Sequence, residues 1–242
     1  MFIDRSKIQA IPPVTLNLII INFLFYLATL VLRQSDIDLI SILGLHYFES
    51  SKFNLIQLIS YMFLHANFSH IFFNMFSLFM FGRMLEQIMG AQRYLTYYFI
   101  TGIGAALVQE CVWWFQIRDI LSHSSFNLGN NLIVSQSEFM INYLPELMNN
   151  FITVGASGAI FGILLAFGLI FPNVDLYLMF IPVPIRAKYF VLFYGIIELF
   201  LGVANFSSDP IAHFAHLGGM IFGYLIIRYW KNQDRKNGKY FF

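Results

Sequence analysis

A serine and two histidines in strongly apolar surroundings are the first candidates for chemistry. Ser157 lies in the segment GASGAIFG (155–162), whose small residues leave room for a peptide backbone to approach the hydroxyl. A serine hydroxyl is a weak nucleophile near neutral pH and needs a base, usually a neutral histidine. His213 and His216 are the candidates, and we favour His216.

Phe161 is the reason for preferring His216. It follows Ser157 by one helical turn and shares its face, so its ring can stack on the imidazole. Among acidic residues only Asp209, in the preceding loop, lies near either histidine in sequence. We therefore predict a Ser157–His216 dyad and not a triad. A hydrogen-bonded structural role is the alternative for each histidine.

Acyl transfer also requires donors for the negative charge that develops on the substrate oxygen. His70 and Asn74 are spaced four residues apart and present an imidazole N–H and a carboxamide on one helical face. They are candidates for an oxyanion hole. The alternative for Asn74 is a hydrogen bond that joins two helices.

Small residues spaced four apart flank both candidate catalytic residues. Gly155 with Ala159, and Gly158 with Gly162, surround Ser157, and Gly219 and Gly223 follow His216. Such pairs are typical of close helix packing in lipid. The two interpretations are compatible, because close packing of these helices can bring His216 to Ser157.

Composition places these residues in a membrane protein. Of the 242 residues 58% are hydrophobic, 19% aromatic and 11% charged, against roughly 25% charged in soluble domains. The length accommodates six spans of about 20 residues in one membrane domain. The single cysteine, Cys111, excludes an intramolecular disulfide, and a net charge of +1 argues against nucleic-acid binding.

We predict an all-α membrane protein, a bundle of six transmembrane helices with an interfacial loop (33–68) between the first two. Residues 116–150 are expected to form a long polar loop, and residues 231–242 a basic cytoplasmic tail. The six predicted spans are residues 14–32, 69–88, 91–115, 154–171, 188–206 and 211–230.

Basic residues predict the orientation, because cytoplasmic loops hold the excess of Lys and Arg. Both termini are predicted in the cytoplasm, so that Ser157, His216, His70 and Asn74 lie in the outer leaflet and the site opens externally. The predicted cytoplasmic residues are Arg5, Lys7, Arg83, Arg93, Arg186, Lys188, Arg228, Lys231, Arg235, Lys236 and Lys239; the opposite loops hold Arg33, Lys52 and Arg118.

Four motifs together resemble the rhomboid family of intramembrane serine proteases. They are FLHANFSHIFFN (63–74), Glu86 with Gly90, GASGAIFG (155–162) and AHLGGMIFG (215–223). The resemblance implies Ser157 as nucleophile, His216 as general base, and His70, Asn74 and the Ser157 backbone N–H as the oxyanion hole. It also implies that residues 188–211 move to admit substrate. Phe161 departs from the tyrosine that is frequent in the family.

The expected substrates are single-pass or multi-pass transmembrane proteins, cut in or near their helices in the cell membrane, which is the inner membrane if the source is Gram-negative. We predict no cofactor, no metal and no nucleic-acid partner.

A second interpretation is a non-catalytic relative that retains transmembrane clients. A third is a metal transporter with His65, His70, His213 and His216 as ligands, although no carboxylate is evident beside them. Glu110 and Glu198 lie in apolar segments, and no partner is evident for either.

Overall fold

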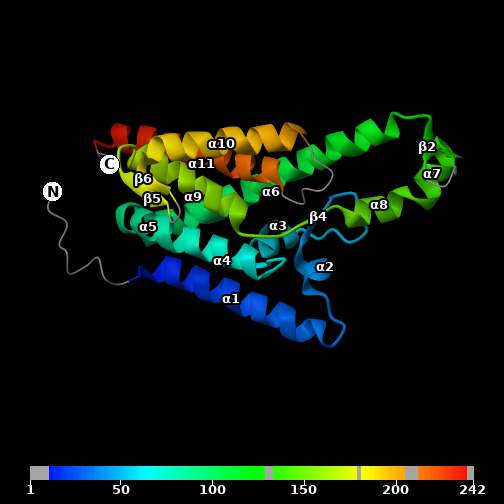
Figure 1. Ribbon diagram of the computed structural model, residues 1–242, viewed down its shortest axis with the longest axis horizontal. Coiled ribbons are helices and arrows are strands. Elements are labelled where there is room, and N and C mark those ends of the chain that lie inside the picture. Colours follow the sequence, from blue (N-terminus) through cyan, green and yellow to red (C-terminus); the bar gives the residue numbers. More distant parts are fainter. Residues whose placement is uncertain (1–10, 129–132, 179–180, 205–211, 239–242) are drawn as a thin grey trace.

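The protein is predominantly helical (Figure 1). The computed structural model describes residues 11–128, 133–178, 181–204 and 212–238. Asp209 and the basic residues Arg5, Lys7 and Lys239, all used above, lie outside the described residues. The predicted all-α class omitted three short antiparallel strand pairs, β1 with β4, β2 with β3 and β5 with β6.

The first helix, α1 (Pro13–Arg33), begins with proline in its first turn, a position where the missing N–H costs nothing. Its next backbone N–H groups meet the buried carboxylate of Glu86. Val14 N and Thr15 N donate to it at 2.9 and 2.7 Å, and the Thr15 hydroxyl donates at 2.7 Å. Glu86 therefore satisfies donors that the first turn of a helix leaves unpaired, and its charge suits the positive helix end.

A nearly continuous helical run follows the first loop. It consists of α4 (Phe68–Ser77), a π-helical segment η3 (Leu78–Gly82) and α5 (Arg83–Met89). Gly90 then reverses the chain with a φ of 79°, which glycine adopts without strain. The long helix α6 (Ala91–Leu121) returns across the bundle.

The second half supplies α9 (Ser157–Ile170), α10 (Ala187–Ala204) and α11 (His213–Lys236). The last helix packs against both α6 and α9. Arg93 of α6 and Asp234 of α11 form a bidentate ion pair at 2.7 and 2.8 Å. Residues 231–236 of the expected basic tail are therefore helical and tied to the bundle.

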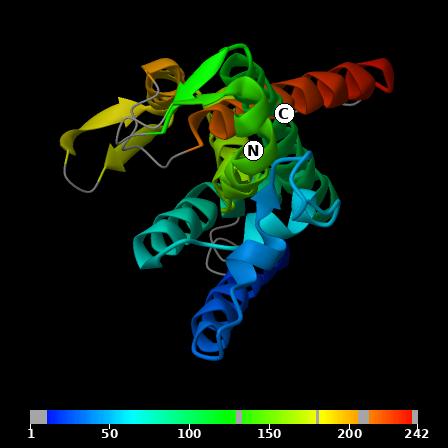
Figure 2. The ribbon, with the colours of Figure 1, turned by 90° about the vertical axis from the view of Figure 1, so that its right-hand side faces the viewer.

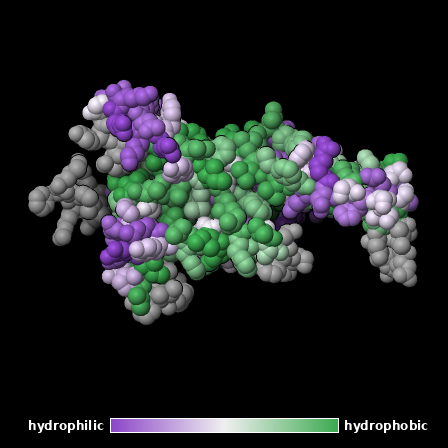
Figure 3. Space-filling view, turned by 90° about the horizontal axis from the view of Figure 1, so that it is seen from above, coloured by the Kyte–Doolittle hydropathy of each residue, from purple (hydrophilic) through white to green (hydrophobic). Residues whose placement is uncertain are grey.

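Apolar side chains cover much of the outside of the bundle (Figure 3). Among the described residues, three helices are long and apolar enough to cross a membrane: α1, α6 and α10. The helix α9 is apolar but shorter. Exposure of this much apolar surface is stable in lipid and costly in water. The count of six spans, the orientation and the interfacial placement of residues 33–68 remain predictions.

The segment between α1 and α4 packs against the residues that immediately precede α9. It contains α2 (Leu39–Leu43), β1 (Leu45–His46), α3 (Gln57–Ser60) and the 3₁₀ turn η2 (Tyr61–Phe63). The strand β1 pairs with β4 (Ile152–Thr153), and the Gly155 N–H donates to the Tyr61 carbonyl at 2.9 Å. This segment therefore fixes the chain immediately before Ser157.

Residues 116–150 are not the simple polar loop that the sequence predicted. The helix α6 runs to Leu121, and beyond it come β2 (Ser125–Asn127), β3 (Ile133–Ser135), α7 (Gln136–Asn142) and α8 (Leu144–Asn150). These elements extend away from the bundle as an arm (Figure 1). Phe126 stacks on Phe139 at 3.9 Å between ring centroids, so the arm has a small core of its own.

A second hairpin connects α9 to α10. It is formed by β5 (Asp175–Leu178) and β6 (Ile181–Arg186), lies at one end of the bundle (Figure 1) and projects to its side (Figure 2). Lys188 lies just after β6, and its ammonium donates to the Asn173 side chain at 3.1 Å. The hairpin thus lies at the end of α9 remote from Ser157.

Glu86→Ala should lower the free energy of unfolding by about 2–4 kcal/mol, because it leaves the buried first-turn donors of α1 without an acceptor. The measurement is thermal unfolding in detergent. Glu146→Ala, which removes an exposed carboxylate from α8, is the control and should change little. Equal melting temperatures for the two variants would contradict this role of Glu86.

Candidate active site

Ser157 is the first residue of α9, at the point where the chain turns into the bundle. Gly155, two residues earlier, has a φ of 129°, and a Cβ there would lie 2.7 Å from His70 Nε2. Only glycine suits this backbone and this contact. The backbone N–H groups of the first turn of α9 have no acceptor within the helix, so they are available beside the Ser157 hydroxyl.

His216 lies opposite Ser157 on the first turns of α11. Its Nε2 is 2.8 Å from the Ser157 Oγ. The Phe161 ring lies parallel to the imidazole, with 4.2 Å between centroids and 7° between planes. The structure therefore brings together Ser157, His216 and Phe161 as the spacing predicted. The imidazole is held from one face by an aromatic ring and from its edge by the hydroxyl.

Glycines make this approach of α9 and α11 possible. A Cβ on Gly219 would collide with the Gly158 carbonyl oxygen, and a Cβ on Gly223 would lie 3.3 Å from the Gly162 Cα. On the other side of α9, a Cβ on Gly158 would meet Ala105 at 2.5 Å. The backbones are in contact where these residues lack side chains, as in other close helix pairs in lipid.

Glu198 of α10 completes a buried polar chain that the sequence did not predict. Its Oε2 lies 2.9 Å from His216 Nδ1 and 2.6 Å from His213 Nδ1. Glu198 is 7% exposed and His216 8%. Asp209, the acidic residue near these histidines in sequence, lies outside the described residues, and the carboxylate that contacts both rings is that of Glu198, for which the sequence showed no partner. Glu110 also has a partner, because the Phe48 N–H donates to it at 2.9 Å.

The sequence does contain an indication that Glu198 contacts these histidines, but it depends on the relative positions of residues on two successive helices. Glu198 lies six residues before the end of α10, and His216 lies three residues after the start of α11. Helices that follow one another in opposite directions place such positions at similar depth. An ionisable residue inside an apolar segment requires a polar partner at that depth, and the first turns of the next helix offer two.

A cavity of about 560 Å³ opens beside Ser157. His70, Asn74, Gly155 and His216 line it together with Ser157, so the predicted oxyanion donors share one space with the nucleophile candidate. The Ala66 N–H points at His70 Nδ1 at 3.5 Å, a long contact that favours the tautomer with the proton on Nε2. In this tautomer the His70 Nε2–H can donate a hydrogen bond to an oxyanion in the cavity.

His65 supports the His70 ring from outside the cavity. The two rings meet edge to face, with 5.0 Å between centroids. Burial, and secondarily the neighbouring His70, lowers the pKa of His65 to about 3, so this ring is neutral near pH 7. His65 thus packs against His70 without placing a positive charge beside it.

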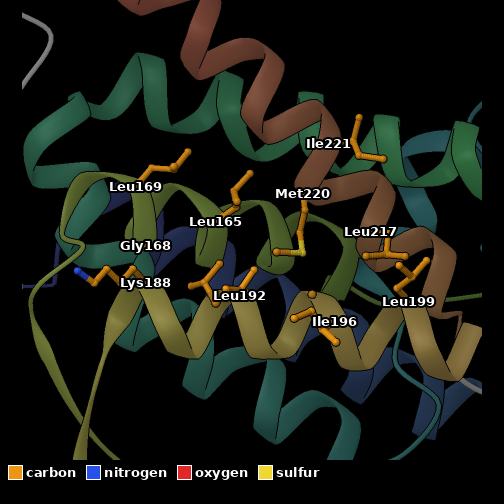
Figure 4. A pocket seen from close by; sticks show the side chains of 12 residues that line it. Leu165, Gly168, Leu169, Lys188, Leu192, Ile196, Leu199, Leu217, Met220 and Ile221 are labelled. Atoms are coloured by element: carbon orange, nitrogen blue, oxygen red, sulfur yellow. The ribbon is translucent and has the colours of Figure 1, made fainter.

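A second cavity, of about 400 Å³, lies between α9, α10 and α11 (Figure 4). Apart from Lys188 its lining side chains are apolar, and they include Leu192, Ile196 and Met220. Its one polar lining residue, Lys188, donates its ammonium to the Asn173 side chain at 3.1 Å. The polar groups that could carry out acyl transfer therefore line the cavity beside Ser157 and not this one.

Glu198, His213 and His216 also form a group with metal-ligand atoms within 4.8 Å of one another. Two imidazoles and a carboxylate are donors that Zn²⁺ accepts. Here, however, both imidazoles are hydrogen-bonded to one oxygen of Glu198, which accounts for the cluster without an ion. His65 and His70 form a separate pair, so the four histidines do not make one ligand set. The absence of a metal remains a prediction.

Comparison with known proteins identifies the family. A family model described as the rhomboid domain matches residues 52–232. The chain belongs to the rhomboid family. Rhomboid protease AarA of Providencia stuartii is 31% identical over 172 residues, which are 68% of this chain and 52% of that protein. The mitochondrial rhomboid protein 1 of Saccharomyces cerevisiae is 28% identical over 170 residues, 70% of this chain and 40% of that protein.

The resemblance to rhomboids found in the sequence is thereby confirmed. The rhomboid match contains the whole polar site, from His70 to His216, whereas α1 lies before it. The chain spans about half or less of the length of these two curated relatives. Membership of the rhomboid family accordingly places the site in a known kind of membrane domain.

Gly219→Ala should separate α9 from α11, because the added methyl meets backbone and not a flexible side chain. We expect a loss of about 1–3 kcal/mol of stability together with loss of any activity that depends on the Ser157–His216 contact. Gly195→Ala is the matched control, since its methyl would meet only the Met220 side chain, at 3.4 Å. The measurements are melting temperature and activity of both variants, and a fully active, stable Gly219→Ala protein would contradict the packing argument.

Proposed function

We propose that this rhomboid is an intramembrane serine endopeptidase that cuts other membrane proteins through a Ser157 acyl-enzyme. The observation that carries the proposal is the 2.8 Å contact between Ser157 Oγ and His216 Nε2 at a cavity lined by His70 and Asn74. A nucleophile, a base and candidate oxyanion donors around one space are what peptide-bond hydrolysis requires.

The reaction follows from this arrangement. His216 Nε2 accepts the Ser157 proton as the oxygen attacks the carbonyl carbon, and the imidazolium then protonates the leaving amine. Asn74, His70 and the Ser157 N–H stabilise the oxyanion. Water attacks the ester in the second half, with His216 again as base, which releases the carboxylate and restores the hydroxyl.

The proposed substrates are single-pass or multi-pass transmembrane proteins. A bundle with an apolar exterior meets such partners in the bilayer. Helical peptide bonds are shielded, so a substrate has to unwind locally before its carbonyl reaches Ser157. Segments with glycine, proline or polar residues near the cut unwind most easily and should be preferred. We place the enzyme in the cell membrane, with both termini cytoplasmic and the cavity open to the external side.

Ser157→Ala and His216→Ala should each abolish cleavage of a transmembrane substrate and leave melting temperatures near that of the unmodified protein. The direct measurement is labelling with a fluorophosphonate followed by mass mapping, which should place the adduct on Ser157. Strong chelators serve as a control and should leave the cleavage rate unchanged, which separates this chemistry from metal-dependent hydrolysis. Full activity in either variant would remove the proposal.

Asn74→Ala should reduce kcat about 100-fold with a smaller effect on KM, because an oxyanion donor acts mainly in the transition state. Asn74 is buried against the cavity. Asn22→Ala is the control, since Asn22 is a buried helical asparagine whose amide donates to the Leu18 carbonyl of its own helix. Equal kcat values for both variants would assign Asn74 to helix packing alone.

A further inference from the structure

We infer that Glu198 is a positioning residue for the general base, so that the site works as a chain of Ser157, His216 and Glu198 and not as an isolated dyad. The inference rests on the proposed function and deepens it. It assigns a role in the reaction to a residue of α10, a helix that supplies neither the nucleophile nor the base.

The geometry fixes which nitrogen of His216 carries the proton. Glu198 Oε2 lies 2.9 Å from Nδ1, and an ionised carboxylate only accepts hydrogen bonds. Nδ1 is therefore the protonated nitrogen, and Nε2 is left with the lone pair. Since Nε2 is 2.8 Å from the Ser157 Oγ, the lone pair faces the hydroxyl whose proton it has to take.

His213 holds the carboxylate in place. Its Nδ1 lies 2.6 Å from the same oxygen, Oε2, that contacts His216. Two imidazole N–H groups on one buried oxygen reduce the cost of keeping a carboxylate inside the bundle. They also restrict its rotation. Glu198 is thus fixed relative to α11, which carries both histidines.

Proton movements in this scheme balance at every step. In acylation the Ser157 proton moves to His216 Nε2 while the Oγ–C bond forms, and the same proton leaves with the amine when the C–N bond breaks. The Nδ1 proton stays on His216 throughout. Glu198 neither gains nor loses a proton, and its charge stabilises the imidazolium between the two transfers.

A purely structural alternative exists, in which Glu198 only joins α10 to α11 in the bilayer. The two roles differ in what they change. A structural link affects melting and substrate binding, whereas a positioning residue affects the reactivity of Ser157 toward a small reagent that needs no substrate site. The experiment therefore measures reagent kinetics and stability on the same protein.

The test compares Glu198→Gln, Glu198→Asp and the matched control Glu110→Gln, which neutralises another buried membrane glutamate. Rates of Ser157 labelling by a fluorophosphonate, kcat and KM for a transmembrane substrate, and melting temperatures are measured. We expect Glu198→Gln to slow labelling about 100-fold or more and to lower kcat with little change in KM. The amide nitrogen of glutamine favours the wrong tautomer, with the proton on Nε2.

Glu198→Asp should recover part of the lost rate, because it restores a charged acceptor, and Glu110→Gln should label at the unmodified rate. Labelling of Glu198→Gln at the unmodified rate would overturn the inference and leave the proposed protease standing. Equal rate losses in the Gln and Asp variants, each with a matching loss of melting temperature, would also overturn it in favour of a structural link. Failure of the unmodified protein to label at Ser157 would instead remove the proposed function itself.

Discussion

The close contact between α9 and α11 is the constraint on which the site depends. Lipid supplies no hydrophobic force that drives one apolar helix against another, so close approach relies on small residues and on polar contacts. Gly219 lies against the Gly158 carbonyl, and Gly223 lies against the Gly162 Cα. This packing leaves 2.8 Å between the Ser157 hydroxyl and His216. Any side chain at Gly219 would change the distance on which the chemistry rests.

Two buried carboxylates of the bundle, those of Glu86 and Glu198, are paired in ways that follow from the cost of burying them. Glu86 meets the first-turn donors of α1, and Glu198 meets two imidazoles. In both cases a carboxylate joins two helices, α5 with α1 in the first and α10 with the following helix α11 in the second. The first pair anchors a helix terminus and the second lies at the centre of the site. The same physical rule, that an ionisable group in lipid requires a partner, accounts for both.

Local spacing predicted much of the site. Ser157 and Phe161 are one helical turn apart, and His70 and Asn74 are another such pair, so each pair was recognisable within a few residues. Helices were likewise predictable from long apolar runs. Glu198 was missed because its partners are 15 and 18 residues away on the next helix, and no periodic pattern connects them. The strands β1 and β4 were missed because two-residue pairings carry no periodicity.

In the proposed reaction Ser157 attacks a carbonyl whose oxygen is held by His70 and Asn74 while His216 takes the proton. The decisive measurement is an experimental structure of the protein after reaction with a fluorophosphonate. We expect phosphorus bonded to Ser157 Oγ, with the phosphoryl oxygen within hydrogen-bond distance of the His70 and Asn74 side chains and His216 still beside Oγ. An adduct on another residue, or a phosphoryl oxygen turned away from both side chains, would contradict it.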